Sequence, residues 1–126
     1  MNAPVSTSVR RVLLVEDDYY IARAQTRALS YYGVQVVGPA ATLDDALRLA
    51  DDETLDGAVL DINLRGLSVY PVAELLRARG IPLVFVTGLD DPTIPSQLQG
   101  MPWCQKPVAV EKLVELLFGS VNRATA

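Results

Sequence analysis

Several short apolar runs divide the chain, and each of them ends at a polar side chain. The polar endpoints are the acids at positions 16–18, Asp61, Thr87 and Lys106. Continuous runs of leucine and β-branched residues are typical of strands that are buried on both faces. The polar residues that follow such strands are expected to meet where the strands end.

Longer stretches with a helical spacing of apolar residues separate these runs, which predicts strands alternating with helices. The predicted strands cover residues 11–15, 34–38, 57–60, 83–86 and 103–105. The predicted helices cover residues 19–32, 43–50 and 108–118, and a third helix begins near Ser68 and ends at Gly80. A loop over residues 64–66 is expected to lead from the third strand to that helix.

Capping signals and helix breakers refine these boundaries. Asp18, Thr42 and Ser68 are side chains that cap helix N-termini, and Pro71 suits a first helical turn, where no N–H is needed. Prolines and a glycine interrupt residues 88–102, so the fourth helix in order, at residues 96–99, is expected to be short or disordered.

Five strands alternating with helices predict an α/β fold with a parallel sheet covered on both faces, a three-layer doubly wound arrangement. The length of 126 residues suits one domain. We expect a flexible N-terminal arm at residues 1–9, the domain at residues 10–120 and a C-terminal tail at residues 121–126.

Composition limits the possible functions. A net charge of -4 argues against a nucleic-acid partner, and neither a basic run nor a span of about 20 apolar residues indicates a membrane partner. The single cysteine, Cys104, excludes an internal disulfide and favours a reducing, cytoplasmic location. The absence of histidine leaves carboxylates, hydroxyls and amines for any chemistry.

The acids at the strand ends predict a cation site. If Asp17, Asp18 and Asp61 lie together they repel one another, and Mg²⁺, a hard cation with oxygen ligands, would neutralise them. Lys106 supplies a second positive charge, Asp61 is the natural nucleophile for a phosphoryl group, and Thr87 offers a hydroxyl. Asp18 is explained equally well as a helix cap, and Glu16 is the acid that we expect to be merely solvated.

The chain resembles the receiver domains of bacterial two-component response regulators over residues 11–118. The motifs that carry this resemblance are Leu14-Val15-Glu16-Asp17-Asp18, Leu60-Asp61-Ile62-Asn63, Val86-Thr87-Gly88 and Lys106-Pro107. The resemblance implies a flavodoxin-like fold with strand order 2-1-3-4-5. It also implies that Asp61 accepts phosphate from a sensor histidine kinase or a histidine phosphotransfer protein.

The same resemblance implies a role for each site residue. Asp18, Asp61 and the backbone carbonyl of Asn63 would hold Mg²⁺, with Asp17 acting through water. Thr87 would move toward the phosphate and Lys106 would pair with it, and the Lys106-Pro107 bond would be cis. Trp103 matches the family's switch aromatic.

Finer features resemble an alphaproteobacterial subgroup that has a Phe-Ala-Thr-Gly-type motif and a mobile fourth helix. These features are Phe85-Val86-Thr87-Gly88, the loop 63–66 and the proline-rich segment after residue 88. They predict a stand-alone receiver in a phosphorelay, which acts on an unknown downstream protein or drains phosphate from a kinase. Such a protein is no enzyme beyond its own phosphorylation and dephosphorylation.

Two alternatives remain at this point. One is an interaction module with the same fold that does not depend on phosphate. The other is an aspartyl-phosphate phosphatase, which needs a second acid two residues after the nucleophile, where Asn63 stands.

Overall fold

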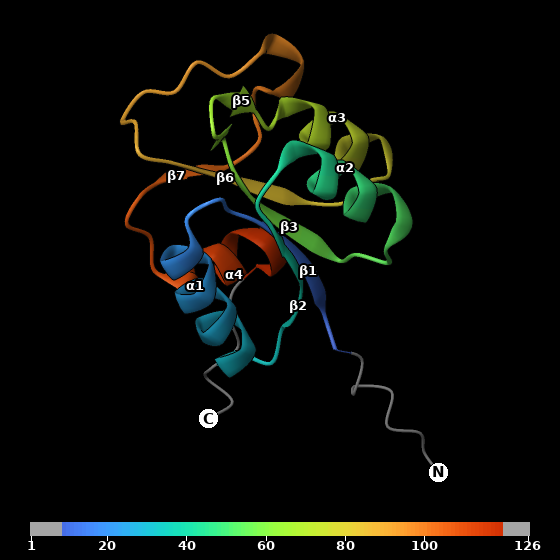
Figure 1. Ribbon diagram of the computed structural model, residues 1–126, viewed down its shortest axis with the longest axis vertical. Coiled ribbons are helices and arrows are strands. Elements are labelled where there is room, and N and C mark those ends of the chain that lie inside the picture. The colour runs from blue at the N-terminus through green and yellow to red at the C-terminus, as the bar shows by residue number, and fades with distance from the viewer. Residues whose placement is uncertain (1–8, 120–126) are drawn as a thin grey trace.

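The computed structural model describes residues 9–119, so the predicted tail and all but the last residue of the predicted arm lie outside the described residues. Five parallel strands form the central sheet in the order β2-β1-β3-β6-β7, which is the predicted order 2-1-3-4-5 (Figure 1). These strands are β1 (Arg11–Val15), β2 (Gln35–Ala40), β3 (Gly57–Asp61), β6 (Leu83–Thr87) and β7 (Trp103–Gln105).

Helices cover both faces of this sheet. They are α1 (Tyr19–Tyr31), α2 (Leu43–Asp52), α3 (Tyr70–Ala78) and α4 (Val110–Phe118). Figure 1 shows α2 and α3 packed together on one face and α1 and α4 on the other. The predicted three-layer α/β fold is therefore confirmed.

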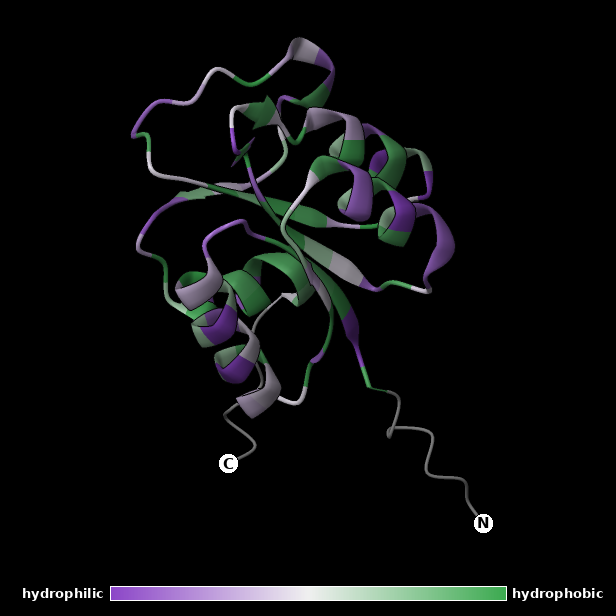
Figure 2. Cartoon of the chain, viewed as in Figure 1, coloured by the Kyte–Doolittle hydropathy of each residue, from purple (hydrophilic) through white to green (hydrophobic). Residues whose placement is uncertain are grey.

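Alternating side chains of the strands feed two separate cores. Leu13, Leu60 and Phe85 lie in the core under α2 and α3, whereas Leu14 and Val84 lie in the core under α1 and α4. All five residues of β3 and all five of β6 are buried, as their uninterrupted apolar runs predicted. Figure 2 shows the same pattern, with apolar strands inside and helices that are apolar on one side.

Several boundaries differ from the prediction. Helix α3 begins at Tyr70 with Val69 as its N-cap, so Ser68 is not the cap, although Ser68 Oγ accepts a hydrogen bond from the Tyr70 N–H at 3.1 Å. Pro71 does lie in the first turn. Helix α4 begins two residues later than predicted, because Ala109 has an extended backbone.

The loop after β3 is a small antiparallel hairpin that the prediction missed. It consists of β4 (Asn63–Leu64) and β5 (Leu67–Ser68), joined by Arg65 and Gly66. Both joining residues have positive φ, 53° and 88°, as two-residue hairpin turns require. Strands of two residues are too short to leave an alternating pattern in the sequence.

The segment after β6 has little regular structure, as predicted. It contains one short 3-10 helix, η2 (Ser96–Leu98), which the fully buried side chain of Leu98 anchors to the core. The orange loop at the top of Figure 1 is this segment. None of the helices in residues 9–119 is long and apolar enough to cross a membrane.

Candidate functional site

The carboxyl ends of β1, β3, β6 and β7 meet at one edge of the sheet. The parallel register pairs Asp61 with Val86 and Thr87 with Gln105, so the residues that follow these strands lie side by side. Glu16, Asp61 and Thr87 are each at least 94% buried, although all three are polar. Buried polar side chains need partners, and this edge of the sheet supplies them.

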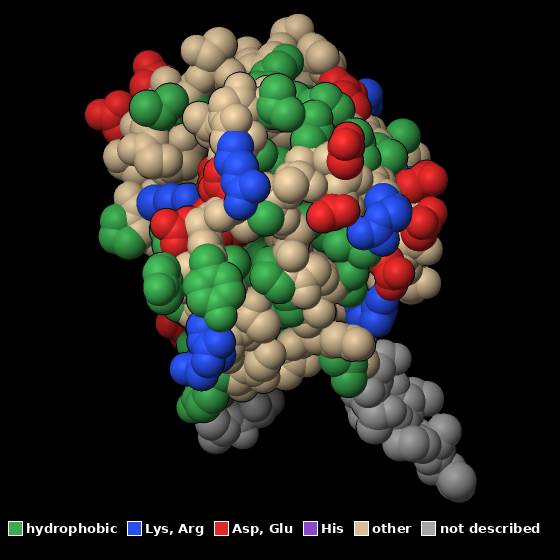
Figure 3. Space-filling view, in the orientation of Figure 1, with side chains coloured by type: hydrophobic (Ala, Val, Ile, Leu, Met, Phe, Trp, Pro, Cys, Tyr) green, Lys and Arg blue, Asp and Glu red, His purple; other side chains and the backbone are tan. Residues whose placement is uncertain are grey.

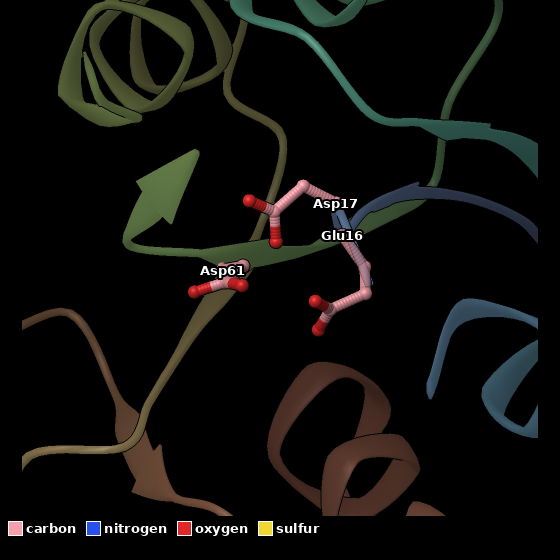
Figure 4. Close-up of side chains that lie close together, drawn as sticks. All are labelled: Glu16, Asp17 and Asp61. Carbon is pink, nitrogen blue, oxygen red and sulfur yellow. The ribbon is translucent and has the colours of Figure 1, made fainter. Parts of the chain in front are cut away.

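Three carboxylates converge at this edge. Glu16 and Asp17 follow β1, and Asp61 ends β3; their ligand oxygens lie within 4.8 Å of one another. Figure 4 shows the three carboxylates turned toward one another from the two strand ends. Like charges at this distance repel, so the arrangement needs positive charge.

Lys106 supplies one positive charge. Its Nζ lies 2.9 Å from Glu16 Oε1 and 3.1 Å from Asp61 Oδ2. Burial alone would lower the pKa of Lys106, but its hydrogen bonds and its attraction to the two carboxylates outweigh burial and raise it. Acidic and basic side chains adjoin one another in the space-filling view, to the left and above the position of α1 (Figure 3).

Glu16 has a raised pKa. Its burial is the main cause, and the negative charge of Asp61 adds to it. The hydrogen bonds from Lys106 and from the Asp18 backbone N–H act in the opposite direction. Within residues 9–119, Lys106 is the one cation that forms an ion pair with any of the three carboxylates. The site therefore holds more negative than positive charge.

Thr87 closes the site on the side of β6. Its Oγ1 accepts a hydrogen bond from the Leu89 N–H at 3.1 Å, and its carbonyl accepts one from the Lys106 N–H at 2.7 Å. The second bond links the ends of β6 and β7, which places Lys106 beside Asp61. The Lys106-Pro107 bond is cis, as the resemblance implied.

A family model agrees with this geometry. The model of the response regulator receiver domain matches residues 12–118. The chain belongs to this family. Receiver domains are not catalytic enzymes beyond their own phosphorylation, so the phosphatase alternative is set aside. The acidic triad is typical of the receiver Mg²⁺ site.

Individual receivers show the same likeness. The response regulator MprA of Mycolicibacterium vanbaalenii is 28% identical over 122 residues, which are 91% of this chain and 52% of MprA. The chain thus spans about half the length of this relative. The solution structure of SdrG from Sphingomonas melonis Fr1 is 37% identical with a TM-score of 0.74, covering 86% of this chain and 96% of SdrG.

A second SdrG structure shows the BeF3-activated conformation of that protein, from a source given as Pseudomonas melonis Fr1. It is 39% identical with a TM-score of 0.71 and covers 85% of this chain and 94% of that one. The chain is thus similar to SdrG over most of both molecules.

The structure corrects the prediction about which acids of this receiver form the cluster. Asp18, predicted as a metal ligand, is the N-cap of α1, where its Oδ1 accepts hydrogen bonds from the N–H groups of Tyr20 and Ile21 at 2.9 and 3.0 Å. Glu16, predicted to be solvated, is 3% exposed and lies in the cluster.

The physical reason is that the sheet continues one residue past β1. The Glu16 N–H donates to the Ala40 carbonyl at 3.0 Å, so Glu16 still takes part in the ladder with β2. The acidic cluster is therefore one residue earlier than predicted. The preference of Asp for the N-cap position was the signal in the sequence that favoured this reading.

The remaining predicted residues lie around the triad. The Asn63 N–H donates to Asp61 Oδ1 at 3.2 Å, which places the start of β4 against the triad. Trp103 begins β7 opposite Phe85 and is 38% exposed. Its side chain is therefore accessible to solvent or to a partner.

Proposed function

We propose that this receiver accepts a phosphoryl group on Asp61. The observation that supports the proposal is the place of Asp61 at the end of β3, inside the acidic triad and within 3.1 Å of the Lys106 ammonium. A carboxylate can form an aspartyl-phosphate when the charge of the transferred group is balanced. Lys106 and Thr87 lie where they can supply part of that balance.

The transfer is a displacement at phosphorus. A carboxylate oxygen of Asp61 forms a bond to phosphorus while the bond from phosphorus to the donor's histidine nitrogen breaks, and the electron pair stays on that nitrogen. Lys106 Nζ donates to the phosphoryl oxygens in place of Asp61 Oδ2, and the Thr87 hydroxyl donates to another oxygen. The Thr87 hydroxyl can donate its proton in this way while Oγ1 still accepts the hydrogen bond from the Leu89 N–H.

A divalent cation fits the donor set of this site. The ammonium of Lys106 pairs with two of the three carboxylates, and carboxylate oxygens are the ligands that Mg²⁺ prefers. Glu16, Asp17 and Asp61 would hold the ion, with the Asn63 carbonyl that the resemblance implies, whereas Asp18 is engaged at the N-cap. When bound, the ion supplies charge neutralisation at the phosphoryl oxygens.

The partners follow from the family. Receiver domains partner histidine kinases, and the donor for this chain is a sensor histidine kinase or a histidine phosphotransfer protein. Phosphorylation then changes the surface around Thr87 and Trp103 for a downstream protein, or the chain drains phosphate from its kinase. The existence of a BeF3-activated conformation of SdrG supports a phosphate-responsive surface.

The test uses the Asp61→Asn protein mixed with a phosphorylated cognate kinase and Mg²⁺. We expect the unmodified protein to take up labelled phosphate and Asp61→Asn to take up none. The Asp18→Asn protein is the matched control, because asparagine also caps helices well, and it should be labelled normally. Labelling of Asp61→Asn would show that another residue is the acceptor.

A second experiment separates this function from a phosphorylation-independent interaction module. Beryllofluoride with Mg²⁺ is titrated into the protein while Trp103 fluorescence and backbone amide resonances are recorded. A phosphate-responsive receiver shifts amides of residues 87–108, whereas an interaction module that ignores phosphate gives unchanged spectra.

A further inference from the structure

The hairpin β4–β5 contacts the acidic triad through one backbone group. The Arg65 N–H donates a hydrogen bond of 2.9 Å to Asp17 Oδ2, although 48 positions separate the two residues. The carboxylate of Asp17 thus depends for its orientation on the turn of a hairpin that belongs to another part of the chain.

Asp17 differs from the other two acids of the triad in its free oxygen. Each carboxylate oxygen of Glu16 and of Asp61 either accepts a hydrogen bond or forms an ion pair within the protein. Within residues 9–119, Asp17 Oδ1 accepts no hydrogen bond and forms no ion pair. The Asp17 carboxylate faces the other two acids of the triad (Figure 4). The direction of this oxygen therefore depends on what holds Oδ2.

The turn that holds Oδ2 needs support of its own. Arg65 has a φ of 53°, which is a left-handed conformation and is unfavourable for any residue that carries a side chain. The Asn63 side chain supplies the support, because its Oδ1 accepts a hydrogen bond of 2.7 Å from the Gly66 N–H across the turn. The Asn63 N–H meanwhile donates to Asp61, so Asn63 joins the hairpin to the triad.

We propose that Asn63 is a positioning residue whose side chain holds the hairpin turn so that the Arg65 N–H orients Asp17 for cation binding. This inference rests on the proposed function, since it concerns the same cation site. It assigns the Asn63 side chain a role that is separate from that of its backbone carbonyl. Substitution of a residue that orients a metal ligand through a hydrogen bond typically lowers metal affinity by about tenfold or more.

The experiment measures Mg²⁺ affinity by calorimetry, with the metal alone and no phosphodonor. We expect Asn63→Ala to bind Mg²⁺ about tenfold more weakly than the unmodified protein. Asn63→Ser should recover affinity to within about twofold of the unmodified protein, because a hydroxyl can accept the same bond. Thr42 Oγ1 already accepts a bond from the N–H three residues later in this protein, at 3.2 Å.

Thr42→Ala is the matched control, since it removes a bond of the same kind at the start of α2, and within residues 9–119 the Thr42 side chain makes no hydrogen bond to the triad. It should lower stability and leave Mg²⁺ affinity unchanged. Amide exchange in the unmodified protein gives a second measurement that does not depend on a variant: the Arg65 and Gly66 amides should both be protected.

The outcomes are distinct. Equal Mg²⁺ affinity in Asn63→Ala and the unmodified protein would overturn this inference alone, as would a loss that Asn63→Ser does not recover, or unprotected Arg65 and Gly66 amides. Absence of Mg²⁺ binding by the unmodified protein would overturn the proposed function as well.

Discussion

Glu16 and Lys106 form an ion pair of 2.9 Å between the end of β1 and the residue that follows β7. The Glu16 side chain is 2% exposed and the Lys106 side chain 23% exposed. A buried carboxylate without a partner is costly, so Lys106 stabilises the site in addition to the role that we propose for it toward a phosphoryl group.

The identity of the acidic ligands can be tested with two adjacent substitutions. Asp17→Asn removes a negative charge from the triad and should weaken Mg²⁺ binding at least about tenfold. About tenfold is the smallest loss expected, because it is already seen when a residue that only hydrogen-bonds to a metal ligand is changed. Asp18→Asn keeps a good N-cap for α1 and should bind Mg²⁺ within about twofold of the unmodified protein. Calorimetric titration with Mg²⁺ measures the affinity of both variants. Weaker binding by Asp18→Asn than by Asp17→Asn would support the prediction from the sequence that Asp18 is a Mg²⁺ ligand.

Lys106→Met should destabilise the metal-free protein. The substitution keeps a chain of similar length but leaves Glu16 and Asp61 without their counter-charge. Breaking a fully buried pair costs about 3–5 kcal/mol, and we expect about 1–2 kcal/mol here because Lys106 retains contact with solvent. Urea unfolding measures the loss, which saturating Mg²⁺ should reduce; the same loss with and without the ion would contradict a shared electrostatic site.

The reactivity of Cys104 should depend on pH in a direction set by burial. Burial raises the pKa of the Cys104 thiol above its ordinary value of 9.0, although Lys112 opposes the shift. The folded state therefore holds its proton to higher pH than the unfolded state does, and this group's contribution to stability is lost as pH rises through the folded pKa.

Alkylation of Cys104 should accordingly be slower in the native protein than in urea at neutral pH, since only the thiolate reacts. Lys112→Gln removes the opposing charge and should move the alkylation profile to still higher pH. A profile that moves to lower pH in Lys112→Gln would contradict this assignment of causes.

Tyr70 should hold the segment that follows β6. Its hydroxyl donates to the Thr93 carbonyl at 2.8 Å, and its ring packs edge-on against Phe85 with centroids 5.6 Å apart. Tyr70→Phe keeps the ring contact and removes one hydrogen bond, which should cost about 1 kcal/mol. Faster amide hydrogen exchange in residues 88–95 is the expected signature.

Tyr31→Phe is the control for that substitution, because Tyr31 is 85% exposed and packs edge-on against Tyr32. It should leave both stability and exchange in residues 88–95 unchanged. If Tyr70→Phe behaves in the same way as this control, the hydroxyl of Tyr70 does not restrain the segment.

Much of this fold could be predicted because the strands are buried on both faces. Such strands read as apolar runs, and the runs ending at Asp61 and Thr87 are β3 and β6, within one residue of their predicted bounds. The scarcity of structure between β6 and β7 was likewise visible, since proline and glycine disrupt the interior of a helix.

The hairpin β4–β5 and the bonds that it makes could not be predicted in this way. Its strands have two residues each, and the turn uses Arg65 with positive φ, where sequence preference would favour asparagine or glycine. Its bond to Asp17 joins residues that are far apart in the chain, and no local pattern records such a contact.

By itself the sequence determined the order of strands and helices and the polar residues at the strand ends, because both follow from local periodicity. The tertiary structure alone decided which acids converge. The ladder bond from Glu16 to Ala40 extends the sheet by one residue, and the N-cap bonds of Asp18 take that acid away from the site. Contacts between distant strands set this one-residue register, and one residue decides whether a carboxylate joins the triad or caps a helix.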